Sequence, residues 1–412
     1  MRRQFLAALF LVPAGMFVIS AAGQTASPAV DTIPPSPAQM AHACDSHCSP
    51  TWMDANLKLD QLQIVATAES YKQRPDRALR NLIRMGGKKG VEALDYGLAP
   101  LTEQLDDDVR GLQFDVAYDP EGGAYKNPAG AGMAMDLLPD DYIHAMEKPG
   151  FKAIHVLDVD YRSSCLALQD CLKQVAAWSK AHPGHLPIFI SLKINDAKTP
   201  MPGATKPVAC DDTALDALDA EIRANFAPDE IITPAQMQGS HASLREAAMA
   251  HAWPSLAQAR GKVIFVLNDG TLRAKAYQGQ RKSLEGRAMF VATDDASPMA
   301  AFVSIPDPVK DSARIRQAVQ QGFIVVTRAD EETREARKND GTRRDAAFAS
   351  GAQIIQTDFA MADPAIGSYR VNLADNPEAL CGKELLSEHC VRFTDASTDA
   401  SRALRTVAAA VP

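Results

Sequence analysis

Short apolar runs recur along the middle of the chain, separated by longer stretches of mixed polarity. The runs are rich in β-branched and aromatic residues and are bounded by Gly, Pro, Asn or Asp, which favours buried strands. We predict strands at Gln63–Thr67, Gly111–Tyr118, Ala153–Val159, Pro187–Ile194, Lys262–Asn268, Ala288–Thr293, Gly322–Ala329 and Ala352–Phe359.

Apolar residues at helical spacing lie between most of these runs. Leu168, Leu172 and Val175 mark one helix face after the third predicted strand. Leu215, Leu218, Ile222 and Phe226 mark another, and residues 312–321 and 341–350 precede the last two strands. Strands that alternate with helices predict an α/β fold with a parallel sheet. Eight such units predict a (β/α)8 TIM-type barrel, irregular at its first crossover, with chemistry at the carboxyl ends of the strands.

The two ends of the chain have a different composition. Arg2 and Arg3 precede an apolar stretch at 5–20, and Ala21-Ala22-Gly23 offers small residues for cleavage. This pattern predicts a signal peptide over 1–23, because the stretch is shorter than the ~20 apolar residues of a spanning helix. A membrane anchor is the alternative. We expect export to the periplasm or beyond, a flexible leader at 24–50, a barrel domain at 51–372 and a C-terminal extension at 373–412.

Composition narrows the classes of function. The chain has 412 residues, of which 46% are hydrophobic and 23% charged, an ordinary globular balance. Its net charge of -8 argues against nucleic-acid binding and does not help binding to an anionic membrane. It contains no glycine-rich phosphate loop, nucleophile elbow or HExxH motif, so a serine hydrolase or zinc peptidase has little support.

Seven cysteines fit an oxidising compartment. Three short-range disulfides suggest themselves, and Cys210 is then left over. The pairs are Cys44 with Cys48, Cys165 with Cys171, and Cys381 with Cys390. The connectivity stays open on sequence alone. Zinc held by His42, Cys44, His47 and Cys48 is an alternative, although that spacing fits no standard finger, and free thiols are another.

Two segments carry a resemblance to a known family. Residues 109–116 (VRGLQFDV) and 149–162 (PGFKAIHVLDVDYR) closely resemble the second and third barrel strands of the bacterial, calcium-dependent phosphoinositide phospholipase C-like family. The resemblance covers roughly Leu57 to Asp363. It implies a phosphoric diester hydrolase that needs a base, an acid and a cation, supplied in the family by two histidines and a calcium ion.

The resemblance implies roles for two residues that match the family. His155 stands at the place of the second catalytic histidine, where it takes part in proton transfer or stabilises a phosphoryl oxygen. Asp115 stands at the place of a calcium ligand. Gln113, two residues earlier on the same strand face, replaces a ligand glutamate.

Other places in the family pattern are altered. Ala68 stands at the place of the first histidine, Glu69 at that of an Asn ligand, and Lys193 at that of a ligand carboxylate. An alanine transfers no proton, and an ammonium repels calcium, so a calcium site at Glu69, Gln113 and Asp115 is weak at most. In one hypothesis Lys193 replaces the metal, and Glu69, next to Ala68, acts as the base if burial raises its pKa, with His155 as the surviving acid or base. In the other, the site has lost catalysis.

These observations leave several functions open. The leading hypothesis is cleavage of a phosphoinositide or related phosphodiester, with Arg328 as a phosphate contact or as the partner of Asp330 or Asp358. The alternatives are a catalytically inactive barrel that binds an inositol phosphate or lipid headgroup, and a glycerophosphodiester phosphodiesterase. We expect phospholipid or inositol phosphate headgroups as partners, with transient contact to a membrane surface.

Overall fold

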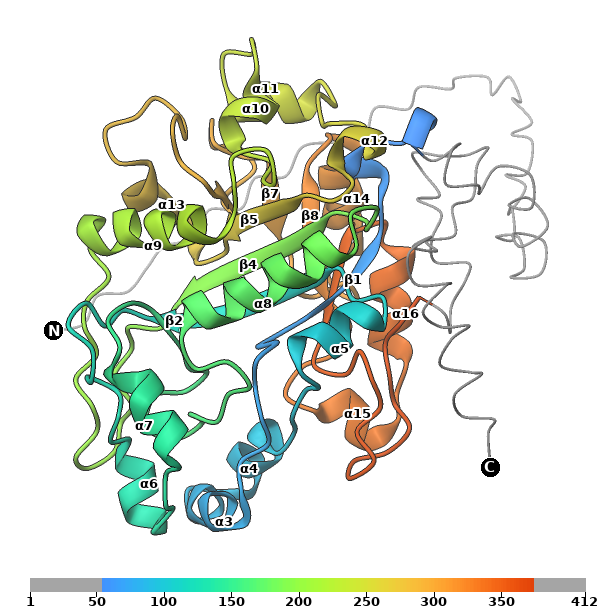
Figure 1. Ribbon diagram of the computed structural model, residues 1–412. Helices are drawn as coiled ribbons and strands as arrows, with labels where there is room; N and C mark the ends of the chain where they lie inside the picture. Colours follow the sequence, from blue (N-terminus) through green and yellow to red (C-terminus); the bar gives the residue numbers. More distant parts are fainter. Residues whose placement is uncertain (1–53, 374–412) are drawn as a thin grey trace, which may run out of the picture. The chain divides into compact units, whose positions relative to one another are not determined.

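Residues 54–373 are described by a computed structural model, and within them parallel strands close into a barrel (Figure 1). The order around the ring is β6-β5-β4-β2-β1-β9-β8-β7, and a bridge between Ala292 and Phe302 joins β6 to β7. The strands are β1 (Ile64–Thr67), β2 (Gly111–Ala117), β4 (Ile188–Ile194), β5 (Val263–Leu267), β6 (Phe290–Val291), β7 (Phe302–Ser304), β8 (Ile324–Arg328) and β9 (Ile354–Thr357), with β3 (Lys152–Ala153) outside the ring. The predicted α/β barrel is therefore confirmed.

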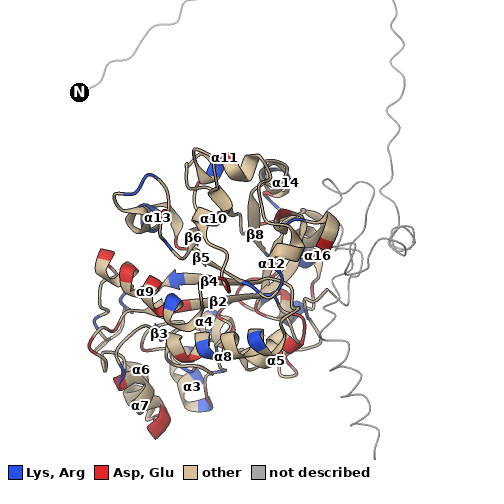
Figure 2. Cartoon of the chain, turned by 45° about the horizontal axis from the view of Figure 1, so that its top comes forward, with Lys and Arg blue, Asp and Glu red and all other residues tan. Residues whose placement is uncertain are grey.

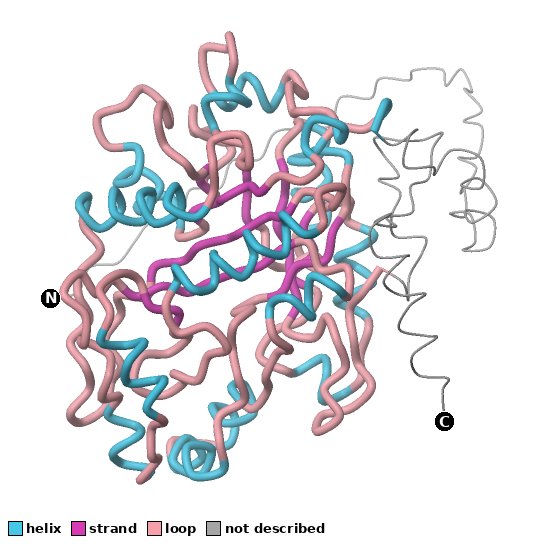
Figure 3. The backbone as a smooth tube through the Cα atoms, viewed as in Figure 1, coloured by secondary structure: helices cyan, strands magenta, loops and turns pink. Residues whose placement is uncertain are grey.

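Helices surround the sheet, which occupies the centre of Figure 3. They are α3 (Arg77–Met85), α4 (Lys88–Leu94), α5 (Leu101–Asp106), α6 (Ala129–Ala134), α7 (Asp140–Glu147), α8 (Leu168–Ala181), α9 (Asp212–Asn225), α10 (Pro234–Gln238), α11 (Leu244–Met249), α12 (Leu256–Ala259), α13 (Gly270–Gln278), α14 (Ser312–Gln320), α15 (Arg334–Lys338) and α16 (Thr342–Ala349), with a 3-10 turn at Leu59–Gln61. No helix of the described part is long and apolar enough to cross a membrane.

Burial explains why these segments form these elements. All five residues of β5 are buried, as expected for a parallel strand covered on both faces. On α8, Leu168, Leu172 and Val175 face the core, while Lys173 is exposed. The Asp211 side chain accepts the Ala214 N–H at 3.0 Å and so fixes the start of α9.

A second, smaller apolar cluster lies beside the carboxyl ends of β1 and β2. It joins α3, α6 and α7, which lie in the lower part of Figure 1, to the segment that follows β3. Its buried members are Leu79, Ala117, Tyr125, Ala131, Tyr142, Met146, Ile154, Leu157 and Tyr161. We call this unit the cap; it supports the chain on both sides of His155.

One predicted strand is wrong. Of Ala153–Val159, only Ala153 belongs to a strand, in β3, which pairs antiparallel with β2 outside the ring. The chain leaves extended geometry because Asp158 adopts a φ of +67° and the Asp160 N–H returns to the Val156 carbonyl at 2.8 Å. The barrel place goes instead to β7, which sequence patterning missed because it has three residues and precedes Pro306.

The cysteine pattern is tested in part. Cys165 and Cys171 form the predicted disulfide, and Cys210 is a buried free thiol. The signal peptide, the leader, the other two cysteine pairs, the zinc alternative and nearly all of the C-terminal extension lie outside the described residues.

Candidate active site

Strand register brings the predicted site residues together at the carboxyl end of the barrel. Asp115 on β2 is the direct partner of Lys193 on β4, and Lys193 Nζ lies 3.4 Å from Asp115 Oδ2. Gln113 Nε2 donates to Asp115 Oδ1 at 2.9 Å and lies 3.4 Å from Glu69 Oε1. His155 Nε2 is 3.9 Å from the same Glu69 oxygen.

Glu69 lies in a turn directly after β1 and has a left-handed φ of +42°. The Ala68 N–H bonds to the Thr357 carbonyl at 2.9 Å, and the Ser70 N–H to the Gln113 carbonyl at 2.9 Å. This turn aims the Glu69 carboxylate inward, where Tyr96 Oη donates to Oε2 at 3.0 Å. A non-glycine residue held in this strained region is typical of functional sites.

His155 is oriented by a carboxylate and a buried lysine. Asp160 Oδ2 lies 2.8 Å from His155 Nδ1 and 3.3 Å from Lys72 Nζ. The side chains of Asp160 and Lys72 are fully buried, and that of His155 is 20% exposed. Asn195 Nδ2 also donates to the His155 carbonyl at 3.1 Å. The Nδ1 side of the ring is thus fixed, and Nε2 faces Glu69.

Charges within the cluster determine its protonation. Burial opposes charging of His155, but the Glu69 carboxylate and the Asp160 hydrogen bond outweigh it and raise the His155 pKa to about 9. Burial likewise opposes ionisation of Glu69, but His155 and Arg328 prevail, so its pKa is lowered. The expected rise in the Glu69 pKa is therefore wrong, and the group is an ionised carboxylate at neutral pH. At neutral pH the arrangement is an imidazolium facing a carboxylate.

The pKa values of Asp115 and Lys193, which form an ion pair, are both raised. Asp115 has a raised pKa because it is buried and lies close to the Glu69 carboxylate. The pKa of Lys193 is raised mainly by Asp115. Lys193 remains half exposed, at 50% of its side-chain surface, so its ammonium can reach a bound anion.

Arg328 closes the cluster on the side of β8 and β9. Its Nη2 donates to Asp358 Oδ1 at 2.6 Å, and its Nε donates to the Asp330 carbonyl at 3.0 Å. Burial raises the pKa of Asp358 to about 7 against the opposing effect of Arg328. The ion pair foreseen from the sequence is therefore present, and Arg328 still contributes positive charge toward Glu69.

The donor set of the cluster does not fit calcium. Glu69, Asp115 and His155 each offer a ligand atom within 4.8 Å of the others. However, the carboxylate oxygens already accept hydrogen bonds from Tyr96, Gln113 and Lys193. Gln113 Oε1 in turn accepts from Gln356 Nε2, which leaves the amide N–H groups, not the oxygen, facing the carboxylates. Calcium requires six to eight oxygen ligands, so donors occupy the positions that it needs.

Some members of the site were not predicted from sequence. Tyr96 and Gln356 carry no motif and come from a loop and from β9. Asp160 could have been found from the sequence, because it follows His155 by five residues in the segment 149–162 that resembles the family. Lys72 follows Glu69 by three residues, the spacing of a tight turn, and its N–H donates to the Glu69 carbonyl at 2.7 Å.

A parallel eight-stranded barrel with its charged cluster at the carboxyl ends of the strands defines the class of TIM-type barrel proteins. A family model described as phosphoinositide phospholipase C, Ca2+-dependent, matches residues 57–382. The chain therefore belongs to the Ca2+-dependent phosphoinositide phospholipase C family, as the sequence motifs predicted.

Solved structures of such enzymes resemble the chain distantly. Apo calcium-dependent phosphoinositol-specific phospholipase C from a Gram-negative bacterium, Pseudomonas sp., has 17% identity and a TM-score of 0.49, over 79% of this chain and 97% of that one. Its myo-inositol complex gives 0.48 at the same identity and coverage. The enzyme from Streptomyces antibioticus gives 0.44 at 17% identity, over 73% and 94%. Curated protein sequences gave no match. These likenesses assign no residue roles to this chain.

Proposed function

We propose that the protein cleaves a phosphodiester of the phosphoinositide type without calcium, using Glu69 as base and His155 as acid. One observation carries the proposal: the Glu69 carboxylate and His155 Nε2 face each other across 3.9 Å, and Asp160 fixes the far side of the ring. A carboxylate accepts the proton of an attacking hydroxyl, and an imidazolium delivers one to a leaving oxygen.

Positive charge for the phosphoryl group comes from side chains in this proposal. Lys193 takes the place of a ligand carboxylate and pairs with Asp115, and Arg328 lies on the opposite side of the cluster. A lysine supplies a single charge, whereas a divalent ion supplies two, so we expect slower turnover than a calcium site would give.

The substrate is proposed to be a membrane lipid, because α3 and α6 of the cap, which contact each other, and the chain after α6 carry exposed apolar side chains. They are Met85, Met133, Met135 and Leu137, of which Leu137 is 92% exposed. We call them the cap patch. Arg84, Lys88 and Lys89 are exposed next to Met85, on α3 and α4 (Figure 2). Asp140 and Asp141 are exposed beyond Leu137, so the basic residues border only the Met85 side of the cap patch. Exposed apolar side chains with basic neighbours are typical of surfaces that contact lipid.

A binding protein without turnover is the second candidate. It is favoured by the Lys193–Asp115 ion pair and by Ala68 at the place of a catalytic histidine. It predicts affinity for an inositol phosphate with no release of product.

The test is release of water-soluble inositol phosphate from phosphatidylinositol, with calcium and with chelator. We expect turnover that survives chelation and falls by about 10²–10⁴-fold in His155→Ala. His144→Ala, which removes an exposed histidine on α7, is the matched control and should keep the parent rate. Lys193→Glu should lose activity in chelator.

Each other outcome has a definite meaning. A gain of calcium-free activity in Lys193→Glu contradicts the role of Lys193. Turnover only with calcium contradicts the metal-free mechanism. No turnover in either condition, together with calorimetric binding of inositol 1-phosphate, supports the binding protein.

A further inference from the structure

The segment that carries His155 lies outside the barrel and is attached at both ends. Residues 154–164, which we call the histidine loop, contain both His155 and Asp160. The loop begins where the Ile154 N–H donates to the Asp115 carbonyl at 3.1 Å and Asn195 Nδ2 donates to the Ile154 carbonyl at 2.8 Å. This end is fixed to the barrel itself.

The other end of the histidine loop pairs with the chain that leaves β1. The Ser164 N–H and Oγ both donate to the Tyr71 carbonyl, at 2.8 Å and 3.2 Å, and the Gln73 N–H donates to the Arg162 carbonyl at 3.2 Å. Lys72 and Ser163 form an antiparallel bridge. The same exit chain, residues 68–73, carries Glu69. This pairing therefore sets the separation of the two proposed acid–base groups.

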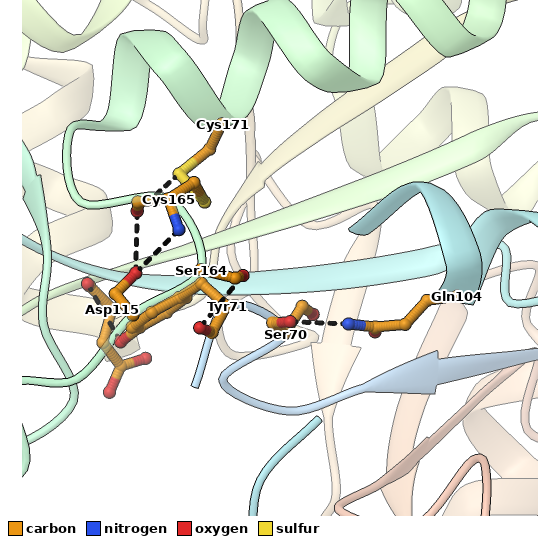
Figure 4. Close-up of a disulfide and its surroundings, with 8 residues drawn as sticks. Ser70, Tyr71, Gln104, Asp115, Ser164, Cys165 and Cys171 are labelled. Atoms are coloured by element: carbon orange, nitrogen blue, oxygen red, sulfur yellow. Dashed lines mark hydrogen bonds between the residues drawn. A yellow bond between two sulfur atoms is a disulfide. The ribbon is translucent and has the colours of Figure 1, made fainter. Parts of the chain in front are cut away.

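A disulfide holds this pairing in place. Cys165 directly follows Ser164 and is bonded to Cys171, in the first turn of α8 (Figure 4). Both cysteines are buried. The helix is anchored in the main core through Leu168 and Leu172. The disulfide thus links the end of the histidine loop to a helix that cannot shift without disturbing the core.

The ion pairs across the loop depend on the same register. Asp160 reaches both His155 and Lys72, so sliding of the loop relative to the exit chain moves the carboxylate away from one of them. The Oδ1 atom of Asp160 is buried without a hydrogen-bond partner, so no second contact within the described part of the chain retains it there. Within the described residues, a few hydrogen bonds and this ion pair join the loop directly to the exit chain, while the disulfide ties the end of the loop to α8.

We propose that the Cys165–Cys171 disulfide is a positioning element of the active site, which holds the histidine loop against the exit chain so that His155 faces Glu69. The inference rests on the proposed function for its catalytic consequence, but its structural part does not. Misplacing a catalytic group by about 1 Å costs on the order of 10²-fold in rate. The disulfide therefore acts on turnover more than on substrate affinity.

The experiment compares the double variant Cys165→Ala/Cys171→Ala with Cys210→Ala, which removes a buried cysteine that forms no disulfide. Hydrogen exchange is followed by mass spectrometry in peptides that cover 154–164 and 68–73, with peptides of β5 and β8 as internal references. We expect faster exchange in the first two peptides of the double variant, an unchanged rate in β5 and β8, and no change in Cys210→Ala.

Kinetics on a soluble inositol phosphodiester supply the second measurement. The double variant should lose kcat by about 10- to 100-fold while KM changes by less than about 2-fold, because binding charges on β2, β4 and β8 remain in place. A second pair, Cys165→Ser/Cys171→Ala, is carried in parallel in case the first does not fold.

The outcomes separate this inference from the proposed function. Unchanged exchange in residues 154–164 overturns the inference, whether or not the parent protein is active. Faster exchange there with unchanged kcat overturns it as well, because the loop would then move without catalytic effect. If the parent protein has no activity but the double variant exchanges faster in residues 154–164, the result supports the structural link and refutes only the proposed chemistry.

Discussion

Replacing Glu221 by glutamine should change how the stability of the protein depends on pH. Glu221 lies on α9 and is buried. Its Oε1 accepts the Phe151 N–H at 2.8 Å, at the turn that leads into β3, and its Oε2 has no partner within the described residues. Burial raises the Glu221 pKa from 4.5 to about 7, against the opposing hydrogen bond from Phe151.

The sign follows from linkage. Because the folded pKa lies above the unfolded one, the contribution of Glu221 to stability is fully present below the unfolded pKa of 4.5 and is lost as pH rises through about 7. A shift of about 2.5 units at 1.36 kcal/mol per unit gives an upper limit of about 3 kcal/mol, and we expect about 1–3 kcal/mol. The Glu221→Gln variant keeps an acceptor for the Phe151 N–H and carries no charge, so it escapes this loss.

Urea unfolding at pH values from about 4.5 to about 8 measures the effect. The variant should match the parent at the acid end and exceed its free energy of unfolding by about 1–3 kcal/mol at the alkaline end. Glu121→Gln, at an exposed position, is the matched control and should show no such divergence. A difference between Glu221→Gln and parent that is the same at every pH refutes the reasoning.

Two further substitutions test other parts of the structure. Lys152→Met should destabilise the protein by about 3–5 kcal/mol in urea unfolding, because it leaves the buried Asp119 carboxylate, now 3.3 Å from Lys152 Nζ, without a charge partner. Its control, Lys198→Met at an exposed position, should have little effect, and equal losses in both would contradict the burial argument. Leu137→Asp in the cap patch should weaken co-sedimentation with anionic phospholipid vesicles several-fold, by loss of apolar contact and added negative charge. Met249→Asp on α11, where another apolar side chain is exposed, should leave it unchanged, and retained binding by Leu137→Asp would exclude the patch as the contact.

The barrel was predictable because most of its strands are continuous apolar runs bounded by turn residues. Such runs reflect burial on both faces of a parallel sheet, and β5, which is apolar and buried throughout, shows it in full. Strand β7 was not predicted, because three residues are too few to show a pattern of apolar and polar positions. Residues 153–159 were wrongly predicted as a strand because they are apolar. Their side chains Ile154 and Leu157 are buried in the cap cluster instead.

The residues of the candidate site also fall into those that the sequence could predict and those that it could not. Residues that lie on barrel strands, such as Asp115 and Lys193, could be placed near each other from the sequence, because parallel strands end at one edge. Partners such as Tyr96 and Gln356 could not, because they come from distant parts of the chain with no motif that marks them. The orientation of Gln113, one of several contacts that count against calcium, depends on Gln356 and so could not be predicted either.

The closure of the ring between β6 and β7 affects where the barrel wall can open locally. One bridge, Ala292 with Phe302, and the bond from the Thr293 N–H to the Phe302 carbonyl at 3.2 Å form this seam. In the order of strands, the seam lies diametrically across the ring from the junction of β1 and β2, whose carboxyl ends carry Glu69 and Asp115. Few backbone hydrogen bonds close this wall, and the contact of Phe290 with Phe302, whose ring centroids lie 5.2 Å apart, stabilises it. We expect backbone opening at this seam, farthest from the proposed chemistry, to leave the alignment of the site unchanged.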